Sequence, residues 1–599
     1  MAVTESVTGG TFGGARAEHE GILRRQSARE SRARTYARAL PIVPVRARGL
    51  TIEGADGRRY LDCLSGAGTL ALGHNHPVVL EAIRKVLDSG APLSVLDLAT
   101  PVKDAFITEL FRTLPPGLAD RARVQFCGPA GTDAVEAAFK LVRAATGRTG
   151  ILAFTGAYHG MTSGALAASG GAADVRVARL PYPQDYRCPF GVGGPRGAEL
   201  AARWTESVLD DPKSGVPLPA GMILEPVQGE GGVIPAPDDW LRRMRRLTTD
   251  RSIPLIADEI QTGVGRTGAF WAVEHSGVTP DVMVLSKAIG GSLPLAVVVY
   301  RDDLDVWEPG AHAGTFRGNQ LAMAAGAATL AHVRENALAE RARLLGSRML
   351  SQLRELQRDF ACVGDVRGRG LMIGVELVDP EGDGGTGEAW GSDGAGARSG
   401  AGDGETGAAG GAAGEWAGAE DAGDRAGGVG VRGGELGVGG GERGRDRGPG
   451  GPGAPGAPGG MGGTVGAGGG AADVLDGVVS AGGGAAGVRD RVPGVRRSTA
   501  HGGGGAVTGW AADARREPRP AAPELAAAVQ RACLERGLIV ELGGRHAGVV
   551  RLLPPLTISD EQAAAVLDRL ADAVAAVARD PAGHGVRPPR PDGGKKPTG

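Results

Sequence analysis

The stretch Pro280-Asp-Val-Met-Val-Leu-Ser-Lys-Ala-Ile-Gly-Gly291 decides the fold class of this chain. Its apolar core, Val282-Met-Val-Leu285, predicts a buried strand, and the two glycines after Lys287 predict a turn. A second apolar run, Ile253-Pro-Leu-Ile-Ala257, comes earlier in the chain and ends at Asp258. We interpret the two runs as neighbouring strands, so that the aspartate and the lysine leave the sheet at the same edge.

A lysine and an aspartate at adjacent strand ends are the pair that an enzyme using pyridoxal phosphate requires. The lysine forms a Schiff base with the cofactor, and the aspartate keeps the pyridine nitrogen protonated so that the ring accepts electrons. A strand-end lysine taken alone is more often a solvated surface residue. The surrounding motifs therefore decide which interpretation of Lys287 holds.

Apolar runs of the same kind alternate with helical stretches on both sides of this segment. They lie at 151–154, 221–224 and 295–300. Near-continuous apolar strands joined by helices predict an α/β fold with a mostly parallel sheet covered on both faces. A second group of helices and strands, at 334–381 and 523–578, predicts a smaller α+β domain.

Residues 382–522 depart from this pattern, because glycine and alanine dominate them, as in Gly448-Pro-Gly-Gly-Pro-Gly-Ala-Pro-Gly456. Too few aliphatic side chains are present to offset the entropy of ordering the backbone, so we predict a disordered insert at a surface connection of the small domain. The other predicted boundaries are 1–33 for a disordered N-terminal tail, 34–65 for an N-terminal segment packing with the small domain, 66–333 for the large cofactor-binding domain, 334–381 and 523–578 for the two parts of the small domain, and 579–599 for a disordered C-terminal tail.

The composition excludes several classes of protein. The formal net charge is -2 over 599 residues, which argues against a nucleic-acid-binding surface or a basic membrane anchor. The chain lacks a run of about 18 apolar residues and an apolar leader, so we expect neither a membrane span nor a signal peptide. The five cysteines lack CxxC spacing, which favours free thiols in a reducing compartment, and hence a cytoplasmic protein: Cys63, Cys127, Cys188, Cys362 and Cys533.

A glycine turn in Gln125-Phe-Cys-Gly-Pro-Ala-Gly-Thr-Asp133 joins a short strand to a helix. Such a turn presents backbone N–H groups and the positive end of the helix dipole, which suits a phosphate group. Thr132 or Asp133 is the predicted N-cap of this helix. A capped helix with no ligand is the alternative that this segment leaves open by itself.

Five further side chains follow predicted strands in the same half of the chain. Tyr158 is suited to stack on a flat heterocycle, and His159, next to it, is a structural residue or a general base. Glu225 and Glu230 are compatible with acid–base catalysis, with metal binding, or with a mobile carboxylate that pairs with an arginine. Gln261, three residues after the aspartate, is placed to hydrogen-bond a phenolic oxygen.

The histidines of Gly73-His-Asn-His-Pro77 are spaced like metal ligands. No cysteine or acidic residue lies near them at the spacing of a metal site. We therefore interpret the segment as a turn and expect no metal ion.

Three ordered motifs together resemble the signature of the class III (ω-type) aminotransferases, which use pyridoxal phosphate. They are Asp258-Glu-Ile-Gln-Thr-Gly-Val-Gly-Arg-Thr-Gly268, Pro280 to Gly291, and Gly314-Thr-Phe-Arg-Gly-Asn-Gln320. The resemblance covers about 34–380 and 523–578. It implies fold type I of these enzymes, in which the large domain has a mostly parallel, seven-stranded sheet.

The resemblance also implies roles for the residues already noted. Lys287 would carry the cofactor and shuttle protons, and Asp258 would pair with the pyridine nitrogen. The remaining cofactor contacts would be the ring oxygen, the ring face and the phosphate, assigned to Gln261, to Tyr158, and to Gly131 with Thr132. In this family the threonine matching Thr315 reaches the cofactor phosphate of the neighbouring subunit, which implies a homodimer with shared active sites.

For the substrates, the resemblance matches Arg551 to an arginine that grips a substrate carboxylate. Glu230 matches the glutamate that pairs with this arginine when the amino donor needs no such grip. Three stretches, 62–77, 96–104 and 125–138, resemble family members that move the 4-amino group between L-2,4-diaminobutyrate and 2-oxoglutarate by a ping-pong mechanism, in ectoine or siderophore biosynthesis. The products would be aspartate 4-semialdehyde and glutamate.

Other functions share the same catalytic residues. Aminotransferases acting on ornithine, acetylornithine or 4-aminobutyrate are the main alternatives. An aminomutase would shuffle an amino group within one substrate and would not need 2-oxoglutarate. A non-catalytic binding module is disfavoured, because the lysine, the aspartate and the arginine are all retained.

Overall fold

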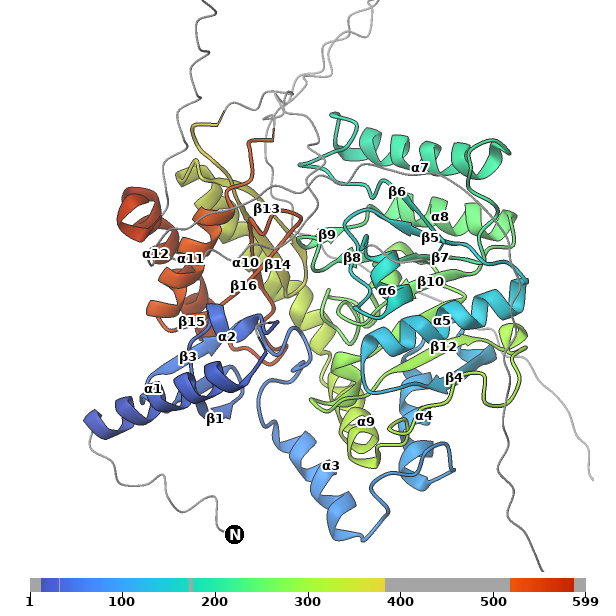
Figure 1. Ribbon diagram of the computed structural model, residues 1–599, viewed down its shortest axis with the longest axis horizontal. Coiled ribbons are helices and arrows are strands. Elements are labelled where there is room, and N and C mark those ends of the chain that lie inside the picture. Colours follow the sequence, from blue (N-terminus) through green and yellow to red (C-terminus); the bar gives the residue numbers. More distant parts are fainter. Residues whose placement is uncertain (1–11, 32, 172–175, 383–517, 586–599) are drawn as a thin grey trace, which may run out of the picture. The chain divides into compact units, whose positions relative to one another are not determined.

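The computed structural model describes residues 12–31, 33–171, 176–382 and 518–585, which all belong to one compact unit. Its largest sheet has seven strands in the order β4-β12-β11-β10-β7-β5-β6 (Figure 1). The strands are β4 (Ala122–Phe126), β5 (Ile151–Phe154), β6 (Val177–Leu180), β7 (Gly221–Leu224), β10 (Leu255–Asp258), β11 (Val282–Leu285) and β12 (Val297–Arg301). Only β12 runs against the other six, which confirms the predicted α/β fold.

Helices cover both faces of this sheet. One face packs on α5 (Gly131–Thr146) and α6 (Ser163–Ala168). The other face packs on α4 (Pro101–Thr113) and α9 (Gln320–Glu335) over one half, and on α7 (Gly194–Asp210) and α8 (Asp238–Asp250) over the other. Because both faces are buried, strands such as β11 are apolar at every position, which is why they appear in the sequence as continuous runs.

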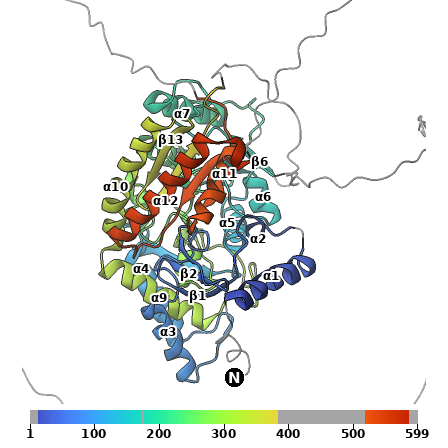
Figure 2. The same cartoon turned by 90° about the vertical axis from the view of Figure 1, so that its left-hand side faces the viewer.

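A four-stranded antiparallel sheet forms the smaller α+β part, in the order β13-β14-β17-β16. Its strands are β13 (Val363–Arg369), β14 (Met372–Leu377), β16 (Glu541–Gly543) and β17 (Val549–Leu552). Figure 2 shows its three helices side by side on one face: α10 (Leu338–Asp359), α11 (Pro523–Glu535) and α12 (Asp560–Arg579). None of the helices in the described ranges is long and apolar enough to cross a membrane.

The apolar run at 538–542 was predicted as one strand, but in the structure it contributes to two strands. Its first half is β15 (Leu538–Ile539), which pairs in parallel with β3 (Arg59–Asp62). Its second half is β16, which belongs to the antiparallel sheet. One short run therefore joins two sheets, the first of which also contains β1 (Pro44–Arg48) and β2 (Thr51–Gly54).

The N-terminal region also differs from its prediction as a disordered tail. Residues Phe12–Arg29 form helix α1, and α2 (Tyr36–Ala39) follows. The α1 sequence is rich in alanine, arginine and glutamate, which favour a helix even without a strong apolar stripe. Residues 1–11 lie outside the described part of the chain. The described chain also contains helix α3 (Pro77–Asp88) and the short strands β8 (Val227–Gln228) and β9 (Ile234–Pro235).

The predicted insert is shorter at its C-terminal end than 382–522. Asp379 donates its N–H to the carbonyl of Pro520 at 3.0 Å, and Ala522 donates to Leu377 at 3.1 Å. Residues 518–522 are thus paired with the chain that enters the insert, and 383–517 lie outside the described residues. The predicted C-terminal tail is likewise described only to Gly585, with a turn of 3-10 helix at Ala582–His584, and 586–599 lie outside.

Candidate active site

A cavity of about 270 Å³ lies where β7, β10 and β11 end and α5 begins. Ligands of open α/β sheets bind at such carboxyl edges, because the connections there leave the two faces of the sheet. Seven of the nine residues predicted from the sequence line it: Gly131, Thr132, Tyr158, Glu230, Asp258, Gln261 and Lys287.

Lys287 lies two residues after the end of β11 and begins a short 3-10 helix. Its φ of +52° is a left-handed conformation, which costs energy for a residue with a side chain. Burial lowers the pKa of its amine, and the nearby charges of Glu230 and Asp258 oppose that shift. A lowered pKa increases the share of neutral amine, the form that acts as nucleophile or proton acceptor.

Asp258 is the last residue of β10, and its carboxylate contacts a buried histidine. His159 Nδ1 lies 2.7 Å from Asp258 Oδ2, and the backbone N–H of Ile260 donates to Oδ1 at 3.1 Å. Burial lowers the pKa of His159, but the hydrogen bond and charge of Asp258, with the charge of Glu225, outweigh burial and raise it. This contact favours the structural role of His159 over that of a general base, the two roles that the sequence left open.

Glu225 follows β7 and joins two loops at the cavity. Its two carboxylate oxygens accept the backbone N–H groups of Tyr158 and Gly229, each at 2.9 Å. Burial is the main cause that raises the pKa of Glu225 to about 7. Because both oxygens accept backbone N–H groups, Glu225 holds the loop that carries Tyr158.

Helix α5, which follows the glycine turn, begins two or three residues earlier than an N-cap at Thr132 or Asp133 would require. The N-cap is Ala130, and Asp133 accepts its backbone N–H from inside the helix at 3.1 Å. The prediction of Thr132 or Asp133 as N-cap was therefore wrong. In the described part of the chain the backbone N–H groups of Gly131 and Thr132 make no hydrogen bond, so this helix end keeps donors for an anion.

Two other cavity side chains have contacts that the sequence did not indicate. Gln261 donates an N–H to the carbonyl of Ala67 at 3.2 Å, while its Oε1 is buried without a partner among the described residues. The hydroxyl of Thr132 lies 2.5 Å from that of Thr162. Tyr158 lies on the wall of the cavity and is 43 % exposed.

Arg551 lies beside the cavity on β17, and its side chain is fully buried. Its Nη2 lies 2.7 Å from Glu230 Oε2, as predicted for these two residues, and also 2.7 Å from Glu541 Oε2. The hydroxyl of Tyr36 donates to Glu541 Oε1 at 2.7 Å. The sequence analysis missed Glu541 and Tyr36, although a lone glutamate within the apolar run 538–542 was a usable signal.

Thr315 is the predicted site residue that stays away from the cavity. It lies in the loop between β12 and α9, and its side chain is exposed. The histidines that were weighed as metal ligands also lie elsewhere. His74 Nε2 is 2.7 Å from Asp62 Oδ2, and His76 precedes α3 with its ring centroid 4.8 Å from that of His332.

The side chains around the cavity fit pyridoxal phosphate. A helix end with free N–H donors suits its phosphate, and a buried carboxylate suits its protonated ring nitrogen. The amine of Lys287 and the half-exposed ring of Tyr158 complete the set that this cofactor needs. The buried Oε1 of Gln261, which has no partner among the described residues, is free to accept a further hydrogen bond.

Comparison with known families and sequences supports the same kind of protein. The family model described as "Aminotransferase class-III" matches residues 32–389. The diaminobutyrate–2-oxoglutarate aminotransferase of Rhizobium meliloti is 57% identical over 376 residues, which cover 61% of this chain and 80% of that protein. The enzyme of the same name from Haemophilus influenzae is 49% identical over 371 residues, covering 61% and 81%.

Solved structures agree on the fold. An (S)-enantioselective ω-transaminase from Thermomicrobium roseum has a TM-score of 0.63 at 21% identity, and the match covers 93% of this chain and 98% of that one. A PLP-bound amine transaminase from an uncultivated Pseudomonas species has a TM-score of 0.62 at 23% identity, covering 92% and 98%.

Proposed function

This chain belongs to the class III aminotransferases, and we propose that it moves the 4-amino group between L-2,4-diaminobutyrate and 2-oxoglutarate. The other two reactants are aspartate 4-semialdehyde and glutamate. The family indicates pyridoxal phosphate as the cofactor. The single observation that carries the choice of substrates is the 57% identity to a relative with this activity in its name.

The chemistry follows from the residues around the cavity. When bound, pyridoxal phosphate supplies an electron-accepting ring and a carbon atom that carries the amino group from donor to acceptor. Asp258 holds a negative charge where the ring nitrogen would lie, and His159 keeps that carboxylate in place. Lys287 accepts and returns a proton at its amine nitrogen, which its lowered pKa favours.

Glu230 and Arg551 let one pocket serve two unlike substrates. With the two side chains paired, the positive charge of the guanidinium is neutralised, and a cationic donor enters without repulsion. When Glu230 moves away, Arg551 is free to bind a carboxylate of 2-oxoglutarate through two parallel hydrogen bonds. Donor product leaves before the acceptor binds, which is a ping-pong order.

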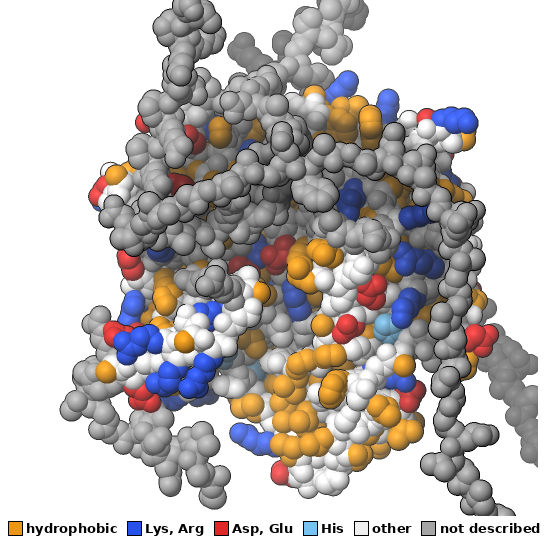
Figure 3. Space-filling model, in the orientation of Figure 1, with side chains coloured by type: hydrophobic (Ala, Val, Ile, Leu, Met, Phe, Trp, Pro, Cys, Tyr) orange, Lys and Arg blue, Asp and Glu red, His pale blue; other side chains and the backbone are white. Residues whose placement is uncertain are grey.

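We also propose a homodimer. Large apolar side chains are exposed along the chain between α3 and α4 and in the adjoining loop before α9: Leu93, Leu96, Leu98 and Phe316. These two segments lie side by side, since Val95 donates its N–H to Gly318 at 3.1 Å, and Figure 3 shows hydrophobic side chains gathered over the region of α3 and α4. Thr315 lies on this surface, where it can reach a second copy.

The five cysteines are free thiols, which suits an enzyme of the cytoplasm.

The exposed apolar surface formed by Leu93, Leu96, Leu98 and Phe316 suits a permanent partner. Sedimentation of the purified protein measures the oligomer, and a monomer at micromolar concentration would contradict the dimer.

The substrates are tested by following the visible absorbance of the cofactor-bound enzyme. We expect L-2,4-diaminobutyrate to bleach the band rapidly, and 2-oxoglutarate to restore it. Ornithine and 4-aminobutyrate serve as competing donors in parallel mixtures. Faster bleaching by either of these would keep the family and change the donor, while bleaching without recovery by 2-oxoglutarate would contradict the acceptor.

A further inference from the structure

Arg551 contacts the carboxylates of Glu230 and Glu541. The proposed replacement of Glu230 by a substrate carboxylate explains the contact with Glu230 but not the contact with Glu541. Glu541 is the register partner of Arg551 on the adjacent strand β16, so its contact comes from the sheet itself. One nitrogen, Nη2 of Arg551, lies 2.7 Å from both Glu230 Oε2 and Glu541 Oε2. Two carboxylates and one guanidinium leave a surplus of one negative charge.

This surplus charge is withdrawn from bulk water. Glu541 is 6% exposed and Arg551 is 0% exposed. Burial raises the pKa of the Glu541 carboxyl, Arg551 opposes that shift, and Glu230 adds to it. A buried charge without a counter-charge is costly, and the other cation that acts on Glu541 is the amine of Lys287, which would be used to hold the cofactor.

The same group is also short of hydrogen-bond partners. Among the described residues, Oε2 of Glu541 makes no hydrogen bond, although it contacts the guanidinium. Its other oxygen accepts the hydroxyl of Tyr36 at 2.7 Å, which fixes the direction of the carboxylate. A ligand with an ammonium group would supply a charge and a donor to this oxygen, while the buried Nε and Nη1 of Arg551, also without partners among the described residues, suit the carboxylate of a ligand.

The Glu541 carboxylate is connected to the cavity through Arg551, which also contacts Glu230 at the cavity wall. The charges of Glu541 and Lys287 act on each other, and Glu230 lines the cavity that contains Lys287. A substrate whose amine reacts at Lys287 therefore has its far end near the acidic group formed by Glu230 and Glu541.

We propose that Glu541 is a specificity-determining residue that binds the second ammonium of a diamine donor. The inference rests on the proposed function, since L-2,4-diaminobutyrate keeps its 2-ammonium while the 4-amino group reacts. 2-Oxoglutarate has no ammonium, so Glu541 favours the donor alone. Arg551 then binds the acceptor after Glu230 moves away, with Glu541 still in contact.

The test compares two donors that differ only in this ammonium. 4-Aminobutyrate is L-2,4-diaminobutyrate without its 2-amino group. In the Glu541→Gln variant we expect kcat/KM of the donor half-reaction with diaminobutyrate to fall by about 10- to 100-fold, as when a buried charged partner is lost. With 4-aminobutyrate and with 2-oxoglutarate we expect changes of less than about threefold.

Two further variants separate recognition from structure. Glu541→Asp keeps the charge and is expected to recover most of the preference for diaminobutyrate. Glu376→Gln is the matched control, because Glu376 is also buried and lies 2.6 Å from an arginine, but it is on β14 and its ion pairs are with Arg367 and Arg187 instead of Arg551. It is expected to leave the donor preference unchanged.

Binding without turnover gives a second readout. Calorimetric titration of the cofactor-bound Lys287→Ala protein with each donor is expected to show the same preference for diaminobutyrate, and Glu541→Gln in that background is expected to remove it. If Glu541→Gln fails to fold, Tyr36→Phe serves instead, since Tyr36 lies on the exposed helix α2. It is expected to reduce the preference by about threefold through loss of one hydrogen bond.

The outcomes distinguish this inference from the proposed function. A wild-type enzyme that does not react with diaminobutyrate contradicts the proposed function. If the wild-type enzyme does react, but Glu541→Gln lowers the 2-oxoglutarate half-reaction as much as the diaminobutyrate one, then Glu541 only orients Arg551 and the inference is wrong. An unchanged ratio between the two donors overturns it as well.

Discussion

At the scale of single residues, the local environment of each carboxylate and amine determines its chemistry. Asp258 and Glu259 are adjacent in sequence and both buried, yet their contacts differ. Asp258 contacts His159 at the cavity, whereas Glu259 accepts the hydroxyl of Thr262 at 2.5 Å and the backbone N–H of Val273 at 2.9 Å. Of these two adjacent acids, Asp258 thus lines the cavity, whereas Glu259 stabilises the turn that follows the strand.

Lys287 provides the most direct test of the active site. We expect Lys287→Ala to abolish turnover, because no other amine replaces its nitrogen. Pyridoxal phosphate should still bind noncovalently, since Asp258 and the N-terminus of α5 are untouched. Turnover assays and the absorbance that remains after dialysis measure the two effects. Turnover at the wild-type rate would refute the role of Lys287.

Glu259 predicts a pH dependence of stability. Burial is the main cause that raises its pKa to about 7, from an ordinary value of 4.5. A carboxyl whose pKa is raised by folding binds its proton more tightly in the folded state. Its cost is therefore absent at acidic pH and grows as the pH rises from 4.5 to 7, reaching about 3 kcal/mol.

In Glu259→Gln this residue no longer titrates. We expect the unfolding free energy of the variant, relative to that of the wild type, to rise by about 3 kcal/mol between pH 4.5 and 7. Urea unfolding at several pH values measures the difference, and the titration of Glu225, common to both proteins, cancels. A difference that stays constant with pH would contradict the prediction.

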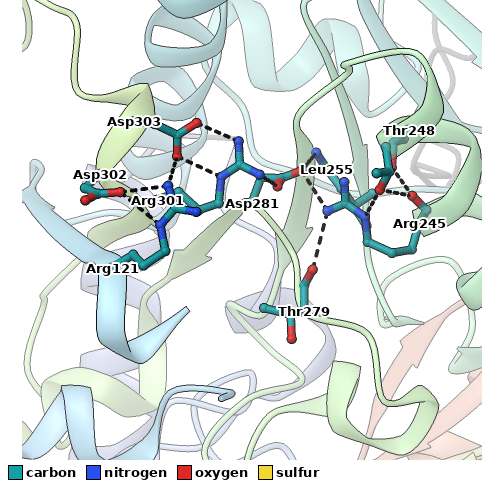
Figure 4. Close-up of polar contacts among 10 residues, drawn as sticks. Arg121, Arg245, Thr248, Leu255, Thr279, Asp281, Arg301, Asp302 and Asp303 are labelled. Carbon is teal, nitrogen blue, oxygen red and sulfur yellow. Dashed lines mark hydrogen bonds and ion pairs between the residues drawn. The ribbon is translucent and has the colours of Figure 1, made fainter. Parts of the chain in front are cut away.

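At the scale of elements, an ion network fixes the amino ends of two central strands (Figure 4). Asp281 precedes β11, is 3% exposed, and accepts the backbone N–H of Leu255 in β10 at 2.7 Å. Its two oxygens also pair with Arg245 of α8 and Arg301 of β12, each at 2.7 Å. One carboxylate therefore holds two strands and a helix together at the edge opposite the cavity.

Asp281→Asn removes both ion pairs while it keeps the shape of the side chain. We expect the unfolding free energy to fall by about 2–4 kcal/mol, somewhat less than for a fully buried pair because both arginines are partly exposed. The kcat of the folded enzyme should not change, since the cavity lies at the other ends of these strands.

Asp303→Asn is the matched control for this network. Asp303 contacts Arg121 and Arg301 at its exposed side, where ion pairs contribute about 0–1 kcal/mol. Chemical unfolding of the two variants measures the contrast. Equal destabilisation by both substitutions would show that burial does not govern this network.

At the scale of the whole molecule, the chain segments just before and just after the insert are paired with each other. Val378 and Ala521 form a β-bridge, and Arg519 donates to the carbonyl of Pro380 at 2.8 Å. The two described ends of the chain, Gly382 and residue 518, therefore leave the fold as neighbours.

A short linker should replace the insert. We expect a protein without residues 384–516, joined by a few glycines and serines, to fold and to keep the wild-type kcat. Loop closure costs about 0.6 kcal/mol for each doubling of length, so stability should stay the same or rise by about 2 kcal/mol. Soluble yield, urea unfolding and turnover check this. An insoluble or inactive product would assign the insert a structural role.

The sequence was sufficient for features that depend on local pattern. Apolar runs on both sides of Lys287 predicted the buried parallel sheet, and the order of strand ends predicted that Asp258 and Lys287 lie at one edge. These inferences succeed because strand burial appears at every position of a run, and because parallel strands share a direction. The motifs of the family were equally local.

Only the tertiary structure decided the contacts between distant segments. The run at 538–542 divides between two sheets, and that division places Glu541 opposite Arg551. The contact between His159 and Asp258 and the pairing at 518–522 are likewise set by strand register and packing. Periodicity reports which faces of an element are buried, whereas the partner across that face depends on how the whole chain folds.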